Sequence, residues 1–147
     1  MKVLVLHGVN LNRVGKREPK QYGTITLDEI DRRLAELGQE LGVEVATFQT
    51  NAEGAMCERI HAAFDQKVDA VVINPGAWTH YSYAIHDALE ILTVPVIEVH
   101  MSNIDAREPF RRVSVIKAIA REQIMGHGVD SYLMGLRAAV AAAKAAS

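Results

Sequence analysis

Short apolar runs alternate along the chain with longer segments in which apolar residues recur every three or four positions. The short runs predict β-strands buried on both faces, because such strands lose the polar–apolar alternation of a half-exposed sheet. We expect five strands, over residues 2–6, 43–48, 70–73, 95–99 and within 115–125. The longer segments predict amphipathic helices over residues 27–41, 53–66, 79–92 and 130–146. A polar stretch with a proline, residues 103–112, predicts a loop or a short helical turn.

Strand and helix alternate about five times, which indicates a parallel sheet covered by helices on both faces. Right-handed crossovers and five strands favour the strand order 2-1-3-4-5. We therefore predict the α/β class, as a flavodoxin-like three-layer sandwich with a five-stranded parallel sheet. The 147 residues suffice for one full hydrophobic core and contain no linker, so residues 1–147 are expected to form a single catalytic domain.

Composition indicates which cellular compartment and which classes of partner to expect. Apolar residues make up 49% of the chain, which argues against disorder. The formal net charge of −2 gives no sign of a nucleic-acid or anionic-membrane partner, and no apolar run approaches the ~20 residues of a membrane span. Cys57 is the one cysteine, so no intramolecular disulfide can form, and Met1 leads directly into a strand without a signal-peptide pattern. We predict a cytoplasmic protein with no nucleic-acid and no membrane partner.

Ligands of open α/β sheets bind beyond the carboxyl ends of the strands, where the strand order reverses. In the predicted order this point lies between the first and third strands. The segments that leave the first, third and fourth strands carry most of the unusual polar residues, namely Asn10, Asn12, Arg17, Tyr22, Asn74, Thr79, His80, His100, Ser102, Asn103 and Arg111. Residues 49–51 end the second strand and are expected at the rim. Three polar segments that converge on one edge predict an active site there.

Residues 10–23 predict a mobile active-site loop with Gly15 and Gly23 as hinges. Tyr22 can act as a general base only in its ionised form. The ordinary pKa of tyrosine is about 10, so ionisation near neutral pH costs about 4 kcal/mol. Arg17 lies five residues away and can supply much of this in a dry site. The alternative interpretation is a surface arginine and an aromatic residue in a turn.

Residues 74–77 follow a buried strand and precede a predicted helix, whose first amides would favour an anion such as a carboxylate. Asn74 and Thr79 can also be capping residues, and the two interpretations are compatible. His80 falls in the first predicted helical turn and is, taken alone, typical of a surface histidine. Asp87 lies roughly 10 Å further along the axis at 1.5 Å per residue. It could share a small ligand with His80 only if a neighbouring subunit brought it in.

His100 follows the fourth predicted strand, and Glu98 lies two residues earlier on the same strand face. A histidine oriented by a carboxylate is a usual general acid–base arrangement. The alternative is a histidine at the edge of the core with a structural glutamate. Arg111 lies in the polar stretch that follows. It is either a bidentate partner for a carboxylate or, like most such arginines, simply solvated.

The sequence gives no sign of a metal or a cofactor. Its six histidines lack metal-ligand spacing, and its glycines match neither nucleotide-binding pattern. A tyrosinate base, an imidazole acid and donors for anions suit proton abstraction beside a carbonyl, followed by loss of a leaving group. We therefore predict an enzyme that acts on a small polar acid without metal or cofactor.

Several spaced motifs occur in one order over nearly the whole chain. They are Asn10-Leu11-Asn12, Arg17-Glu18-Pro19-x-x-Tyr22-Gly23, Asn74-x-Gly76-Ala77-x-Thr79-His80-x-Ser82, Asp87-Ala88-Leu89, Glu98-Val99-His100-x-Ser102-Asn103 and Arg107-Glu108-Pro109-Phe110-Arg111. In these motifs the sequence resembles the type II 3-dehydroquinate dehydratases (type II dehydroquinases), a family of hydro-lyases. The fold of that family agrees with the fold predicted from periodicity.

The resemblance implies dehydration of 3-dehydroquinate to 3-dehydroshikimate by anti elimination through an enolate. Tyr22 matches the base that removes the proton next to the ketone, and Arg17 matches the residue that lowers the pKa of this tyrosine. Asn10 matches the residue that holds a water at the enolate oxygen. His100 matches the acid that protonates the departing hydroxyl, and Glu98 matches its orienting partner.

The resemblance also implies substrate-binding positions at Asn74, His80, Met101, Ser102 and Arg111. Met101 and Ser102 would bind through their backbone amides. Asp87 matches a residue donated by the adjacent subunit, and the family assembles as trimers stacked into dodecamers.

Alternatives remain at this point. The chain could be a non-catalytic binding module on a flavodoxin-like scaffold, or an assembly protein that keeps the fold without turnover. The same reaction serves the shikimate pathway of aromatic amino acid biosynthesis and the catabolism of quinate, and the sequence does not separate the two. Trp78, Tyr81 and Tyr83 are bulkier than the usual residues of the family, so they are expected to alter the pocket or the subunit contacts.

Overall fold

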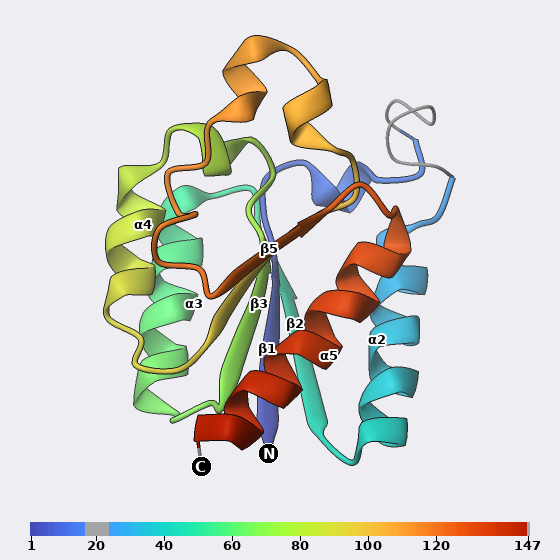
Figure 1. Cartoon of the computed structure of the whole chain (residues 1–147), viewed down its shortest axis with the longest axis vertical. Helices are drawn as coiled ribbons and strands as arrows, with labels where there is room; N and C mark the ends of the chain where they lie inside the picture. Colours follow the sequence, from blue (N-terminus) through green and yellow to red (C-terminus); the bar gives the residue numbers. More distant parts are fainter. Residues whose placement is uncertain (17–23, 147) are drawn as a thin grey trace.

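The computed structural model of the chain describes residues 1–16 and 24–146. Its sheet has five parallel strands in the order β2-β1-β3-β4-β5, which confirms the predicted class and strand order (Figure 1). The strands are β1 (Lys2–His7), β2 (Glu44–Gln49), β3 (Ala70–Asn74), β4 (Val96–His100) and β5 (Glu122–Met125). The α-helices are α2 (Leu27–Leu41), α3 (Glu53–Asp65), α4 (Tyr83–Glu90) and α5 (Val129–Ala146). Short 3₁₀ turns are η1 (Leu11–Arg13), η2 (Gly76–His80), η3 (Ile104–Ala106) and η4 (Pro109–Arg112).

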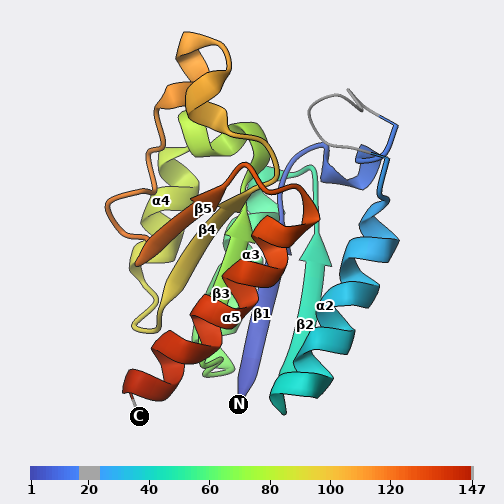
Figure 2. The same ribbon diagram turned by 45° about the vertical axis from the view of Figure 1, so that its right-hand side comes forward.

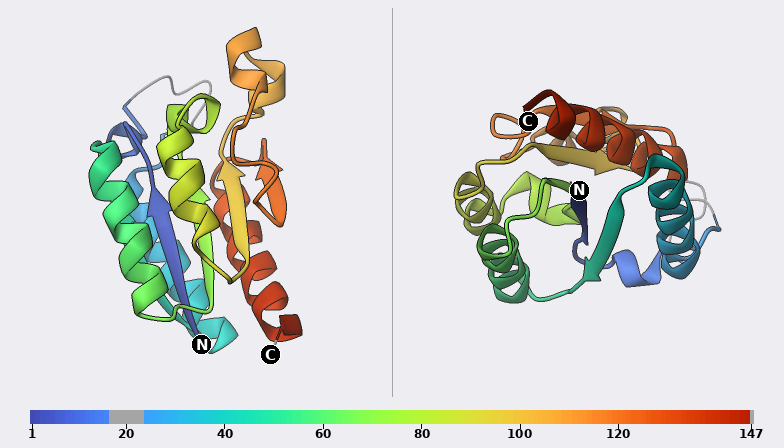
Figure 3. Two further views of the ribbon diagram at one scale, coloured as in Figure 1. Left: turned by 90° about the vertical axis from the view of Figure 1, so that its left-hand side faces the viewer. Right: turned by 90° about the horizontal axis from the view of Figure 1, so that it is seen from below.

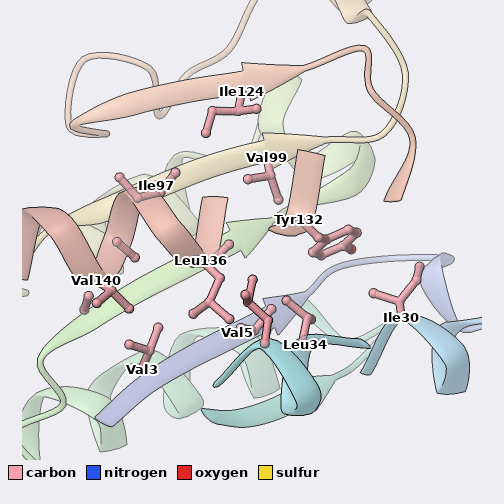
Figure 4. Packing of buried hydrophobic residues seen from close by; sticks show 14 of the residues in the cluster. Val3, Val5, Ile30, Leu34, Ile97, Val99, Ile124, Tyr132, Leu136 and Val140 are labelled. Atoms are coloured by element: carbon pink, nitrogen blue, oxygen red, sulfur yellow. The ribbon is translucent and has the colours of Figure 1, made fainter. Parts of the chain in front are cut away.

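Helices α2 and α5 cover one face of the sheet, and α3 and α4 cover the other, which gives three layers (Figures 2 and 3). Strand β1 shows how the core is divided. Val3 and Val5 pack in the cluster with α2 and α5 (Figure 4), whereas Leu4 and Leu6 pack in the cluster with α3 and α4. All four side chains are fully buried. Burial on both faces is therefore the reason that this strand is a continuous apolar run.

Helix α2 begins and ends where its sequence predicts. The side-chain oxygen of Thr26 accepts a hydrogen bond from the backbone N–H of Glu29 at 3.3 Å. Gly42 follows the helix with φ +71°, a conformation that favours glycine and closes the last turn. Ile30 and Leu34 are fully buried, so the apolar face of the predicted helix is the face that packs on the sheet.

The structure divides the helix predicted over residues 79–92. The 3₁₀ turn η2 comes first, and α4 begins at Tyr83 with Ser82 as its N-cap, where the Ser82 oxygen accepts from the N–H of Ile85 at 3.0 Å. Thr79 does not cap the helix, because its hydroxyl donates to Glu98 instead. The long-range hydrogen bond from Thr79 to Glu98 thus overrides the local preference of Thr79 to cap a helix.

The anion site expected at the start of this helix is not formed. The backbone amides of Tyr81 and Ser82 donate to the carbonyl of Trp78. Amides already bonded to the backbone do not present a cluster of donors to an anion. This part of the prediction was wrong because the helix starts four residues later than expected.

The segments that follow β1, β3 and β4 gather at one end of the molecule, with η3 and η4 standing above the strand ends (Figures 1 and 2). The two chain ends lie at the opposite end (Figure 1). The fold thus separates the polar loops from the termini. None of the helices in the described ranges has the length and apolar character needed to cross a membrane.

Gly8 allows a close approach of two backbone segments at the polar end. A Cβ at this position would lie 2.2 Å from the carbonyl oxygen of Pro75. We expect Gly8→Ala to lower the free energy of unfolding by about 1–3 kcal/mol, since backbone rather than a flexible side chain would have to move. Chemical denaturation measures this. Gly54→Ala is the matched control, because nothing lies within 4 Å of a Cβ there, and equal stability of the two variants would contradict the prediction.

Candidate active site

A cleft opens at the carboxyl ends of β1, β3 and β4. It is lined by Val9, Leu11, Asn74, Gly76, Ala77, His80, His100, Met101, Ser102, Ile104, Arg107 and Arg111. Six of the predicted site residues are in this set, namely Asn74, His80, His100, Met101, Ser102 and Arg111. Arg17 and Tyr22 lie outside the described residues. The structure therefore brings together the polar residues of the segments that follow β3 and β4.

Glu98 lies inside β4 and is completely buried. Its Oε2 accepts hydrogen bonds from Nε2 of His100 and from Oγ1 of Thr79, both at 2.6 Å. Oγ of Ser114 lies 2.9 Å from Oε1 and 3.0 Å from Oε2. Burial acts to raise the pKa of this carboxyl, but the hydrogen bonds from His100, Thr79 and Ser114 outweigh it and hold the pKa of Glu98 below its ordinary value. The group is therefore a carboxylate with every oxygen engaged.

His100 is the last residue of β4, and its side chain is almost fully buried. Because Nε2 is committed to Glu98, Nδ1 is the nitrogen available to a ligand in the cleft. A ring protonated on both nitrogens would donate to Glu98 through one and to a ligand through the other, with the carboxylate balancing its charge. This is the arrangement of an oriented general acid.

His80 belongs to the 3₁₀ turn η2 and not to the helix α4. Its Nδ1 donates to the backbone carbonyl of Val113 at 2.7 Å, which leaves Nε2 for a ligand. Burial, together with the charges of His100 and Arg111, lowers the pKa of His80, and the carbonyl of Val113 offsets this in part. A neutral His80 offers the cleft an acceptor at Nε2, which suits a ligand hydroxyl.

Arg111 is held from two sides in the turn η4. Its Nε donates to Oε2 of Glu108 at 2.6 Å, and its guanidinium carbon lies 4.7 Å from the ring centre of Phe110. The hydrogen bond from Arg111 also keeps the pKa of Glu108 below its ordinary value. With Nε fixed in this way, the terminal amino groups remain to pair with a carboxylate in the cleft.

Arg107 and Ser114 are residues of the site that the sequence analysis did not assign. Arg107 lines the cleft, with NH1 at 3.4 Å from Oγ of Ser102. Its position four residues before Arg111 in a polar turn is a signal that could have found it. Ser114 offers no such signal, because it reaches Glu98 from 16 residues away through the fold.

Asn10 lies between Val9 and Leu11, which line the cleft, and contacts the segment that follows β2. It adopts a left-handed conformation with φ +68°, and its backbone N–H donates to Oδ1 of Asn51 at 2.8 Å. Nε2 of Gln49 donates to the same oxygen and to the carbonyl of Gly8. The side chains of Gln49 and Asn51 thus hold the backbone of Gly8 and Asn10 where the chain leaves β1. That residues 49–51 lie at the rim of the cleft stays a prediction.

Asp87 lies on α4, away from the cleft, with 77% of its side chain exposed. Nδ1 of His86 donates to its Oδ1 at 3.1 Å, and Glu90 brings a third ligand-type atom within 4.8 Å. Such groups are common on exposed helices without an ion, so this cluster carries no metal assignment. Asp87 has no access to the cleft of its own chain.

Trp78, Tyr81 and Tyr83, the bulky residues noted in the sequence, do not line the cleft. Trp78 is buried in the core cluster under α3 and α4. Tyr81 and Tyr83 are 59% and 71% exposed, and neither lines the cleft. The two tyrosines therefore belong to the outer surface, and an effect of these three residues on pocket shape or subunit contacts stays a prediction.

The fold and the cleft define an α/β protein with an oriented histidine–carboxylate pair and cationic side chains at the carboxyl edge of its sheet. The family described as "Dehydroquinase class II" matches residues 1–140 of the chain. The chain belongs to this class II dehydroquinase family.

Relatives agree with the family over nearly the whole length. A protein of Leptothrix cholodnii named 3-dehydroquinate dehydratase is 69% identical over 140 residues, which cover 95% of this chain and 94% of the relative. The crystal structure of a type II dehydroquinase from Butyrivibrio crossotus is 41% identical with a TM-score of 0.93, and covers 95% of this chain and 97% of that one. The type II dehydroquinase from Propionibacterium acnes is 50% identical with a TM-score of 0.90, over 92% and 93% of the two chains.

Because the pKa of Glu98 is lowered in the folded chain, the free energy of unfolding depends on pH in the acid range. A carboxyl that ionises more readily in the folded chain stabilises the fold above its unfolded pKa of about 4.3, and this contribution is lost as the pH falls through the folded value. We expect the gap in unfolding free energy between the wild type and Glu98→Gln to shrink from about pH 5 downwards. Urea denaturation at a series of pH values measures the gap, with the exposed Glu40→Gln on α2 as control. A gap that stays constant into acid would contradict the assignment.

Proposed function

We propose that this chain is a 3-dehydroquinate dehydratase of the hydro-lyase class, which removes water from 3-dehydroquinate by anti elimination through an enolate. The observation that carries the proposal is the buried Glu98 bonded to His100 at the wall of the cleft, in a chain of the class II dehydroquinase family. The relatives that bear the name 3-dehydroquinate dehydratase support it.

The base in this proposal is Tyr22, in the sequence between η1 and α2. It removes the proton next to the ketone, and the guanidinium of Arg17 stabilises its ionised form and the charge that develops. The electrons of the broken C–H bond move to the ketone oxygen as an enolate. Asn10 holds a water at this oxygen, and its strained backbone is fixed by Asn51. Collapse of the enolate then expels the hydroxyl group on the neighbouring carbon.

The acid is His100. Its Nδ1–H protonates the departing hydroxyl, which leaves as water, and the imidazole becomes neutral. Glu98 holds the other nitrogen and balances the charge of the protonated ring. Thr79 and Ser114 fix this carboxylate, so the ring plane is set before the substrate arrives.

The cleft binds the substrate through groups of different kinds. Arg111 pairs with its carboxylate, and the backbone amides of Met101 and Ser102 add donors beside it. His80 accepts from a ring hydroxyl at Nε2, as its hydrogen bond to Val113 requires. Asn74 supplies a side-chain amide on the same wall.

The proposed assembly is a dodecamer built as a tetramer of trimers. Asp87, exposed on α4 and remote from its own cleft, would reach the cleft of the adjacent subunit. The proposed setting is the shikimate pathway of aromatic amino acid biosynthesis in the cytoplasm. The free thiol of Cys57 is usual for that compartment.

Tyr22→Phe tests the base. The variant is expected to keep the oligomer and to lose turnover at least about a thousandfold, since no other group replaces the tyrosinate. The assay mixes purified protein with 3-dehydroquinate and follows the ultraviolet absorbance of the conjugated enone product. Tyr83→Phe, at an exposed tyrosine, is the matched control with a near-normal rate. Near-normal turnover of Tyr22→Phe would remove the tyrosinate mechanism, and no rise with the wild type would remove the proposed reaction.

Arg17→Ala tests how the tyrosinate is stabilised. Loss of the guanidinium should raise the pH at which Tyr22 ionises, so the rate should fall on the order of a hundredfold near neutrality and recover in part at higher pH. The same assay, run as a pH–rate profile, measures this. Arg13→Ala, at an exposed arginine on η1, serves as control. An unchanged rate with an unchanged profile would show that Arg17 has no such role.

A further inference from the structure

A chain of four polar side chains, three of them buried, runs behind the cleft wall and joins four elements of the fold. Asp31 lies on α2, His7 ends β1, Tyr132 lies on α5 and Asn74 ends β3. Oδ1 of Asp31 is 2.7 Å from Nε2 of His7, and Nδ1 of His7 is 2.9 Å from the hydroxyl of Tyr132. Nδ2 of Asn74 is 3.0 Å from the same hydroxyl. Of these four residues, Asn74 alone lines the cleft.

The surroundings of this chain are apolar. The side chain of His7 is 1% exposed and Tyr132 is fully buried, whereas Asp31 is 31% exposed and reaches solvent. Tyr132 packs in the apolar cluster under α2 and α5, beside residues such as Val5 and Ile30 (Figure 4). Polar groups in such a place destabilise the fold unless each is hydrogen-bonded. A purely apolar filling would avoid this demand, so the polar chain needs a reason other than packing.

The hydrogen bonds of the chain can run in one direction. Nδ2–H of Asn74 can only donate, so the oxygen of Tyr132 accepts from it. Burial raises the pKa of Tyr132, which keeps its hydroxyl protonated, and this proton is donated to Nδ1 of His7. His7 then carries its own proton on Nε2 and donates it to the carboxylate of Asp31. Each donor has an acceptor, and the free carboxylate at the end sets the direction.

The amide of Asn74 is thereby fixed at both ends. Its Oδ1 accepts from the backbone N–H of Gly76 at 3.1 Å, while Nδ2 donates to Tyr132. A flipped amide would place NH₂ against the N–H of Gly76 and two donors would meet. Asn74 therefore keeps one N–H and one lone pair for the cleft, on known sides of the amide.

We propose that His7, Asp31 and Tyr132 are positioning residues that hold the side-chain amide of Asn74 in the orientation that binds a hydroxyl of the substrate. The proposal rests on the proposed function for the identity of the substrate. The chemistry it implies is a polyhydroxylated acid, one hydroxyl of which accepts from Nδ2–H of Asn74. His80, on the same cleft wall, offers an acceptor for hydroxyl protons.

Tyr132→Phe is the first test, because it removes the hydroxyl and keeps the ring in the core. The KM for 3-dehydroquinate is expected to rise about tenfold, with kcat within about threefold of the wild type, since Asn74 binds the substrate and takes no part in proton transfer. A purely structural role would lower the melting temperature and leave KM unchanged. An unchanged KM in a folded Tyr132→Phe variant would overturn the proposal.

His7 allows a rescue experiment. His7→Gln offers a carbonyl that accepts from Tyr132 and an amide that donates to Asp31, so KM should stay within about threefold of the wild type. His7→Leu breaks the chain and should behave as Tyr132→Phe does. Equal KM values for His7→Gln and His7→Leu would overturn the proposal. Asp31→Leu removes the acceptor at the end of the chain and should raise KM, whereas Asp28→Leu, at an exposed aspartate on the same helix, should not.

A double-mutant cycle shows whether the effect passes through Asn74. In an Asn74→Ala background, Tyr132→Phe should change KM no further, because the amide it orients is gone. An additional tenfold rise would place the effect elsewhere and overturn the proposal.

The histidine tautomer gives a reading that needs no turnover. In ¹⁵N-histidine-labelled wild type, the signal of His7, identified by its loss in His7→Gln, should report a neutral ring protonated on Nε2 and not on Nδ1. A ring protonated on Nδ1 would overturn the proposal even if the variants fail to fold. If the wild type shows this tautomer but no turnover of 3-dehydroquinate, the proposed function is wrong, while the hydrogen-bonded chain from Asp31 to Asn74 is still supported.

Discussion

Burial of the sheet on both faces is the constraint on which the rest of this structure depends. Strands β1, β3 and β4 have no exposed face, so their side chains must be apolar or fully hydrogen-bonded. Polar chemistry is therefore displaced to the segments beyond the carboxyl ends of the strands, and those of β3 and β4 meet in one cleft. Glu98 is the instructive exception, because its carboxylate sits inside β4. It is tolerated there since three side chains donate to it.

The polar groups of the cleft share one feature, which is that each is hydrogen-bonded to a partner within the protein, either a near neighbour in the sequence or a residue of a distant segment. The pairs are His100 with Glu98, His80 with Val113, Arg111 with Glu108, and Asn74 with Tyr132. In each pair one polar atom is fixed by the partner and another remains for the cleft. Donors and acceptors oriented before the ligand arrives need little reorganisation during a reaction. The cleft is in this sense assembled by the fold and not by the ligand.

Sequence reasoning predicted the strand order because apolar periodicity and right-handed crossovers leave few arrangements. It placed Asn74, His80 and Arg111 at one edge by the rule that carboxyl ends of parallel strands converge. It failed where two distant segments compete for one group. The local sequence favours Thr79 as a helix cap, but its hydroxyl donates to Glu98, so Ser82 caps α4 instead. The hydrogen bond between Asn74 and Tyr132 joins residues 58 positions apart, and no local sequence pattern predicts it.

The saturation of Glu98 also governs how protons can travel. Its oxygens already accept from His100, Thr79 and Ser114 in a fully buried position, so it can neither store a proton nor pass one in from behind. In the proposed mechanism one residue takes a proton and His100 delivers another, so each cycle leaves His100 without the proton it has given up. His100 would then regain this proton at Nδ1, the nitrogen available to the cleft, through the same opening by which the product leaves. Reprotonation of His100 and release of product are then coupled, so a molecule that occupies the cleft also blocks the return of His100 to its protonated form.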